Sequence, residues 1–236
     1  MMTNKEIRCL ARETLHGKFS SFITLFLCAY IIETLIVSLP SSFLAAPKNL
    51  PLYLSQVLLS ILLEALGSMI MLSINRGALQ LIRGHKTSLA DIFFAFRNQA
   101  DHFLALELFF TIIHTLTSIP IYVYVWITRD SEMSLLTYAI TSNMLSAVAT
   151  GLTILITLIF SMSEFLMLDD PSLTAREALR KSTDLINGST GQYFLLLLSF
   201  LGYIVLGFTS ATIGFLWVVP YITVSQAIFY EKLKES

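Results

Sequence analysis

Six long apolar stretches constrain this chain more than any other feature of its sequence. Each holds about 20 residues, the length with which an α-helix crosses a hydrocarbon core of about 30 Å. They cover residues 19–39, 52–74, 102–127, 145–168, 191–209 and 213–230. We therefore predict an all-α membrane protein, a single integral membrane domain over residues 1–236 with six transmembrane helices in a bundle.

The composition supports a membrane class and excludes others. Of the 236 residues, 55% are hydrophobic and only 13% are charged, against about 25% charged in an ordinary soluble domain. A soluble fold of this chain would expose far more apolar surface than water tolerates. The net charge of −1 provides no basic field, so no nucleic-acid partner is expected.

The placement of cationic residues predicts the orientation. Segments rich in Lys and Arg stay on the cytoplasmic side of a membrane. With six spans, 13 of the 15 Lys and Arg residues fall on one side, and only Lys48 and Arg129 on the other. We therefore expect a multi-pass protein of the cell membrane with both termini in the cytoplasm.

Three cytoplasmic amphipathic helices are predicted, one before the first, third and fifth spans. Each opens with a hydroxyl residue followed three positions later by an acid, the spacing of a capping box. These pairs are Thr3 with Glu6, Ser88 with Asp91, and Thr174 with Glu177.

The first residues of these pairs are 85 and 86 residues apart. Each would open a unit of surface helix, outward span and returning span, which suggests a threefold parallel pseudo-repeat. The alternative is that any six-span chain of this length divides into thirds. Basic residues on the surface helices would bind anionic membrane lipids, or the helices serve only to anchor the outward spans.

Two carboxylates lie near mid-membrane in adjacent predicted spans. Glu33 is about 21 Å from the inner end of its span and Glu64 about 18 Å from the outer end of its own. A charged residue at this depth costs about 2.5–3.5 kcal/mol, so both should face protein or water or be protonated. The pair is the first candidate for a proton or cation site, with helix packing as the alternative.

Three weaker candidates lie in the third and fourth spans. Glu107 and Glu164 are each within about 8 Å of the cytoplasmic end, where a carboxylate reaches headgroup water. Glu107, Thr111 and His114 stack on one helical face, an arrangement suited to a short proton wire. A packing role for His114 is the alternative.

Motifs in the second half of the chain resemble a known family. They are Asp169-Asp170-Pro171, Arg176-Glu177-Ala178-Leu179 and Gly214-Phe215-Leu216-Trp217-Val218-Val219-Pro220-Tyr221. These residues resemble the bacterial integral membrane family catalogued as domain of unknown function 975, with weaker similarity over the rest of the chain. The resemblance implies a polytopic bacterial membrane protein and attaches no activity. The residues that carry it most specifically are Asp170, Pro171, Glu177, Gly214, Trp217, Pro220 and Tyr221.

No catalytic signature stands out in the sequence. There is no glycine-rich phosphate loop and no nucleophile elbow, and Cys9 and Cys28 fit neither a metal site nor a redox pair. We therefore expect no enzyme, no cofactor and no metal. The favoured function is a non-enzymatic membrane component that interacts with lipid, other membrane proteins or itself. The alternative is a small proton- or cation-coupled transporter that uses Glu33 and Glu64.

Overall fold

Helices make up all the regular structure in the part of the chain that the computed structural model describes, residues 2–43, 49–129, 131, 133–210 and 213–235. The elements are α1 (Asn4–Leu15), α2 (Phe19–Phe43), α3 (Leu50–Ile82), η1 (Leu89–Phe93), α4 (Phe94–Arg97), α5 (Ala100–Thr117), α6 (Ile119–Thr128), α7 (Leu135–Thr157), η2 (Leu158–Phe160), α8 (Ser163–Asp169), α9 (Ala175–Ile186), α10 (Thr190–Leu198), α11 (Leu201–Thr209) and α12 (Phe215–Glu235).

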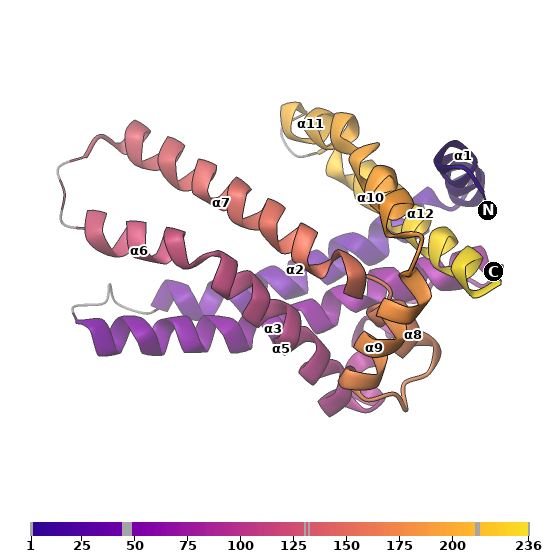
Figure 1. The fold of residues 1–236 in the computed structure, drawn as a ribbon, viewed down its shortest axis with the longest axis horizontal. Helices are drawn as coiled ribbons and strands as arrows, with labels where there is room; N and C mark the ends of the chain where they lie inside the picture. The colour runs from indigo at the N-terminus through magenta and orange to yellow at the C-terminus, as the bar shows by residue number, and fades with distance from the viewer. Residues whose placement is uncertain (1, 44–48, 130, 132, 211–212, 236) are drawn as a thin grey trace.

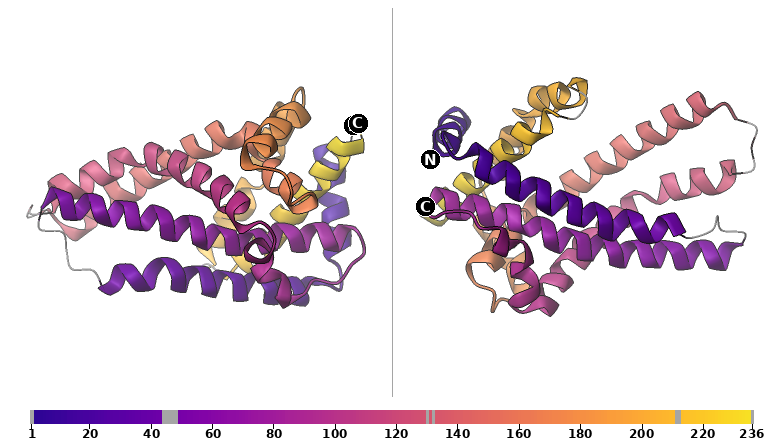
Figure 2. Two further views of the ribbon diagram at one scale, coloured as in Figure 1. Left: turned by 90° about the horizontal axis from the view of Figure 1, so that it is seen from below. Right: turned by 180° about the vertical axis from the view of Figure 1, so that it is seen from behind.

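The long helices form three hairpins (Figures 1 and 2). The first is α2 with α3, the second α5 and α6 with α7, and the third α10 and α11 with α12. Both termini lie at one end of the molecule, whereas α2 and α6 finish at the other end, where α3 and α7 begin (Figure 1). The third hairpin leans away from the other two (Figure 2).

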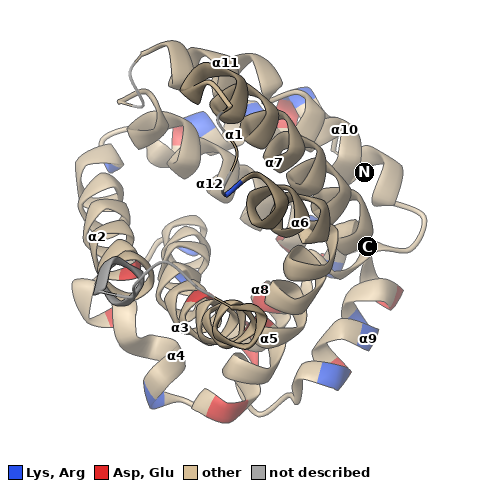
Figure 3. Cartoon of the chain, turned by 90° about the vertical axis from the view of Figure 1, so that its left-hand side faces the viewer, with Lys and Arg blue, Asp and Glu red and all other residues tan. Residues whose placement is uncertain are grey.

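Charged residues gather where the termini lie. Viewed from the opposite end, Lys and Arg appear mainly around α1, α4 and α9, on the rim and behind the tan hairpins (Figure 3). Arg129 is at the near end, where its guanidinium lies 3.9 Å from the centre of the Trp126 ring. Lys48 lies outside the described residues. Among the described residues, this separation agrees with the predicted sorting of cations.

The structure contains fewer clear membrane spans than the six expected. Four helical segments of the described chain are long and apolar enough to cross a bilayer: Phe19–Ser38, Leu50–Ile82, Leu135–Phe160 and Thr190–Thr209. A fifth results if α5 and α6, bent by 52° relative to each other, form one broken span. The architecture is compatible with a multi-pass membrane protein, and the count of six is not confirmed.

The predicted sixth span corresponds to α12, which is not apolar enough to qualify. It is the most enclosed long helix: half of its residues are buried, on faces that contact α1, α2, α3 and α11. A helix that packs mainly against protein tolerates polar residues such as Ser225 and Gln226. Hydropathy alone therefore does not identify its role.

Two predicted spans have different bounds in the structure. The span expected at 102–127 breaks at Ser118, because Pro120 in the first turn of α6 has no amide hydrogen to continue the ladder of α5. The span expected at 145–168 instead covers Leu135–Phe160. It ends where the Ser182 hydroxyl of α9 accepts from the Met162 amide and donates to the Ile159 carbonyl, both at 3.1 Å. These bonds satisfy backbone groups that the broken helix leaves free.

Two of the three predicted capping boxes form. Thr3 with Glu6 begins α1, and Thr174 with Glu177 begins α9, each with both reciprocal hydrogen bonds. Both helices have 12 residues and are followed by a glycine with positive φ, Gly17 or Gly188.

The middle unit differs. Ser88 caps the short 3₁₀ helix η1, but Asp91 does not complete a box, because its carboxylate pairs with Arg76 at 3.0 Å. In this unit the residue with positive φ before the long helix α5 is Gln99, with φ of 54°, instead of a glycine. The predicted threefold pseudo-repeat is therefore not confirmed, since only the outer two units share their capping geometry.

The apolar stripes of α1 and α9 face protein. Ile7, Ala11 and Leu15 of α1 are buried against the bundle, chiefly α12, and the matching positions of α9 are buried against α8 and η2. These helices close one end of the bundle, which favours the anchoring role over insertion of their apolar faces into lipid.

Close packing of α11 on α12 predicts a specific glycine requirement. A Cβ at Gly214 would lie 2.9 Å from the Gly207 Cα and 2.5 Å from the Ser210 Oγ. Gly214→Ala should therefore lower the free energy of unfolding by about 1–3 kcal/mol, measured in mixed detergent. Gly202→Ala is the matched control, because nothing lies within 4 Å of its added Cβ; equal stability of the two variants would contradict the prediction.

Candidate functional site

Polar side chains face each other where α3 and α5 run antiparallel. On each helix they recur at helical spacing, so they share one face. We call this set the polar seam; its members are Glu64, Ser68 and Asn75 of α3 with Glu107, Thr111 and His114 of α5. Its helical face on α5 is the one predicted as a proton wire.

At the far end of the seam, Glu64 contacts histidine. The Glu64 Oε1 lies 3.0 Å from His114 Nδ1, which joins a member of the predicted mid-membrane pair to a member of the predicted wire. Glu33 of α2 is near enough to Glu64 to interact electrostatically, and its side chain packs next to Gly67. A shared proton site of Glu33 and Glu64 stays a prediction.

At the other end of the seam, Glu107 meets Glu164 of α8. Both line a cavity of about 190 Å³ with Ser68, Asn75 and Thr223, which we call the Glu107 cavity. Glu107 is 4% exposed, and its Oε1 has no hydrogen-bond partner among the described residues. The two glutamates judged weaker from the sequence therefore line one cavity.

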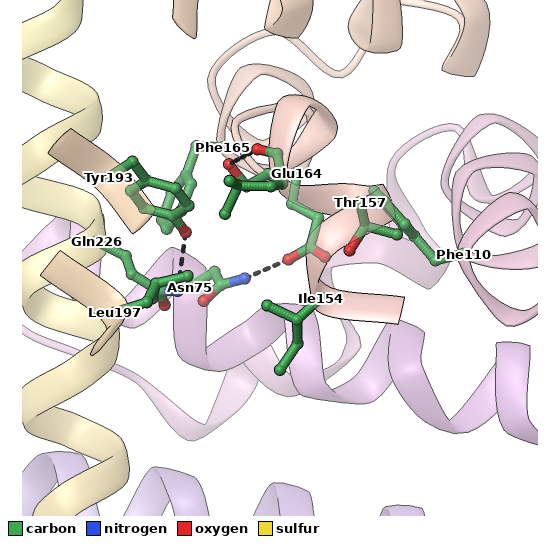
Figure 4. A pocket seen from close by; sticks show the side chains of 11 residues that line it. Asn75, Phe110, Ile154, Thr157, Glu164, Phe165, Tyr193, Leu197 and Gln226 are labelled. Atoms are coloured by element: carbon green, nitrogen blue, oxygen red, sulfur yellow. Dashed lines mark hydrogen bonds between the residues drawn. The ribbon is translucent and has the colours of Figure 1, made fainter. Parts of the chain in front are cut away.

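A second cavity opens on the other side of Glu164. This Tyr193 cavity, of about 210 Å³, shares Asn75 and Glu164 with the first and adds Tyr193 and Gln226 (Figure 4). Asn75 donates a hydrogen bond to Glu164, and Gln226 Nε2 donates to the Tyr193 hydroxyl at 3.0 Å. Glu164 is thus the carboxylate common to both spaces.

Sequence reasoning did not single out Asn75, Tyr193 or Gln226. The sequence could have indicated them, because an amide or phenol inside an apolar helix needs a polar partner. Each lies on a different helix, however, and a single sequence does not reveal which helices meet. Only the packing of α3, α10 and α12 brings them to one place.

The arrangement is suited to proton exchange. No Lys or Arg is among the described residues that line either cavity, so the two carboxylates have no fixed cation beside them. Two carboxyl groups in a water-poor cavity are not both charged without a counterion. The described residues also bring no three His, Cys, Asp or Glu side chains together in a metal-binding cluster.

The family motifs lie around this core and hold helix ends together. Asp170 accepts hydrogen bonds from the amide and hydroxyl of Ser172 at 3.1 and 2.5 Å, in a turn that contains Pro171. The Tyr221 hydroxyl donates to the Arg8 carbonyl at 3.2 Å, which fastens α12 to α1. Pro220 is buried inside α12, and Trp217 is half exposed.

The chain belongs to the family described as Protein of unknown function (DUF975). The family model matches residues 1–236, the whole chain. No curated protein and no solved structure matches it. The match confirms the resemblance at the level of the family; the assignment of individual motif residues in this DUF975 protein stays a prediction.

An ion cluster beside the first motif joins three helix ends of the DUF975 fold. Asp169, at the end of α8, lies 2.7 Å from Arg83 after α3 and 2.7 Å from Lys234 near the end of α12. Tyr230 donates to the same carboxylate at 2.8 Å, and Glu231 also pairs with Arg83. Burial alone would raise the pKa of Asp169, but hydrogen bonds from Lys234, Tyr230 and Arg83 outweigh it and lower the pKa.

The lowered pKa of Asp169 predicts a pH-dependent stability. The cluster stabilises the fold above the ordinary Asp pKa of about 3.9, and this contribution is lost as the pH falls through the lower folded value. Asp169→Asn should reduce the free energy of unfolding at pH 7 by about 1–3 kcal/mol, and the deficit should shrink below about pH 4.

Unfolding in mixed detergent between pH 3 and 7 measures this effect. Asp101→Asn is the control, since the Asp101 side chain is 81% exposed and should contribute little. A deficit for Asp169→Asn that stays constant over the whole pH range would contradict the assignment.

Proposed function

We propose that this protein is a non-enzymatic membrane protein that binds and releases protons within the bilayer, as a small proton-coupled transporter. The observation that carries the proposal is the pair of carboxylates, Glu107 and Glu164, in one cavity without Lys or Arg in its described lining. The proposal includes the cell membrane as its location and cytoplasmic termini, because 13 of the 15 Lys and Arg residues flank one side of the predicted spans.

The first proton carriers in this proposal are not those favoured from the sequence. Glu33 and Glu64 were preferred for their depth, but Glu107 is more enclosed and has a carboxylate oxygen without a partner among the described residues. A buried, unpaired carboxylate oxygen is costly unless the group is protonated or reached by water. This cost makes the Glu107 cavity the better place to load and release a proton.

The polar seam gives the proton a direction. From Glu107 the polar side chains continue along α5 through the hydroxyl of Thr111 to His114. Successive members are about one helical turn, or about 5.4 Å, apart. His114 lies 3.0 Å from Glu64. Water bridges the gaps between such groups at modest cost, and both cavities adjoin the cytoplasmic end in the proposed orientation. The seam therefore leads from that end toward the middle of the predicted spans.

Proton flux into liposomes tests the proposal. Purified protein is reconstituted with an internal pH-sensitive dye, and a potassium diffusion potential drives proton entry. The wild type should exceed protein-free liposomes, and Glu107→Gln and Glu164→Gln should each lose about 90% or more of that flux, because an amide does not carry the proton.

Asp184→Asn is the matched control, since it removes an exposed carboxylate on α9 and should leave flux unchanged. Flux of the wild type no greater than that of empty liposomes under both a pH gradient and a voltage would reject the proposal. Equal flux of wild type and both Gln variants would reject the assignment of these residues.

A second candidate function is interaction with membrane lipids, other membrane proteins or a second copy of the chain. It is favoured by α7, where only 11% of the most apolar stretch is buried. Ser146, Ala147, Thr150 and Gly151 are exposed there, and small residues let transmembrane helices approach closely.

Disulfide crosslinking in native membranes tests self-association. In a chain with Cys9 and Cys28 replaced by Ser, Ala147→Cys should form a dimer on oxidation. Ala149→Cys should not, because Ala149 is 3% exposed. Recovery of both variants only as single chains would exclude this face as an interface between copies.

A further inference from the structure

An apolar groove between α2 and the start of α12 contains a single carboxylate. The groove has a volume of about 700 Å³, within the range of small-molecule sites. Its walls include Phe26, Tyr30 and Glu33 from α2, Met71 from α3, and Phe215 and Val219 from α12.

Glu33 has no compensating partner in this groove. It makes no hydrogen bond and no ion pair with any other described residue, although its side chain is half-buried. Glu64 lies near enough to add like-charge repulsion, while the Glu64 carboxylate itself has His114 beside it. An ionised Glu33 therefore lacks the counter-charge that apolar surroundings demand.

Aromatic rings stand on the same face of α2 as this carboxylate. Phe26, Tyr30 and Glu33 are at positions i, i+4 and i+7, so they line up along the groove. The rings of Phe26 and Tyr30 are stacked, with centroids 6.0 Å apart. Aromatic faces attract organic cations, and the attraction grows when water is excluded.

We propose that this groove binds a hydrophobic organic cation, with the charge beside Glu33 and the apolar body against Phe26, Tyr30 and Phe215. A metal ion fits poorly, because hard cations require about six oxygen ligands and Glu33 is the one carboxylate of the described lining. A neutral lipid chain would fill the apolar walls but leave Glu33 without a counter-charge. The cation satisfies both features at once.

The groove lies next to the proposed proton site and is distinct from it. Met71 and Val219 line both the groove and the Glu107 cavity, so they form the wall between the two. Binding at Glu33 does not depend on proton transfer at Glu107 and Glu164. Either proposal can therefore fail without the other.

Equilibrium binding of tetraphenylphosphonium to the purified full-length chain tests the inference. The protein is held in nanodiscs of phosphatidylglycerol, which has no amine. The wild type should bind one cation per chain saturably, and Glu33→Gln should weaken the affinity about tenfold or more, since about 1.4 kcal/mol corresponds to each factor of ten. Glu164→Gln, which alters the other cavity, should bind within about twofold of wild type.

A second set of measurements keeps the outcome decisive if Glu33→Gln folds poorly. Phe26→Leu and Tyr30→Leu preserve apolar bulk but remove a ring, and each should weaken binding about 2- to 30-fold. Neutral triphenylphosphine oxide should bind at least tenfold more weakly than the cation.

Three results would overturn the inference. The first is unchanged affinity in Glu33→Gln together with both Leu variants. The second is equal affinity for the neutral analogue. The third is loss of binding when phosphatidylethanolamine is added to the nanodiscs, which would identify a lipid headgroup as the occupant.

Discussion

The placement of polar and acidic side chains constrains how the long helices pack. Glu64 and Glu107 lie within the apolar sequences of α3 and α5, where a carboxylate is expensive to leave in hydrocarbon. Antiparallel packing resolves the conflict, because it turns the polar face of each helix toward the other and leaves apolar residues outside. The polar seam thus determines which faces of α3 and α5 meet. Glu164 determines in the same way which face of α8 turns toward them, because it lines the cavity that contains Glu107.

The end of the molecule that carries the termini is built on a different principle. There, charged residues reach water, and specific pairs hold helix ends in place: Asp169 joins the ends of α8, α3 and α12. The capped helices α1 and α9 bury their apolar stripes against the bundle instead of offering them to lipid. Three residues of the family-resembling motifs make hydrogen bonds at this end: Asp170, Glu177 and Tyr221.

The proposed chemistry depends on two different spaces, the Glu107 cavity and the groove at Glu33. Glu107 and Glu164 share a small cavity, where one proton changes the local charge balance. The groove between α2 and α12 surrounds the Glu33 carboxylate with apolar and aromatic side chains. Met71 and Val219 line both spaces and form a wall between them.

The sequence by itself determined the helical content, the presence of helices long and apolar enough to cross a membrane, and both outer capping boxes, because these follow from composition and from contacts within about four residues. It also predicted Glu107, Thr111 and His114 as one helical face. Only the tertiary structure decided that Glu107 meets Glu164, that Tyr193 joins them, and that α12 is interior. Such contacts depend on which helices pack together, and the apolar stripes that drive packing look alike from helix to helix, so partner and rotation are fixed by the whole bundle rather than by any single segment.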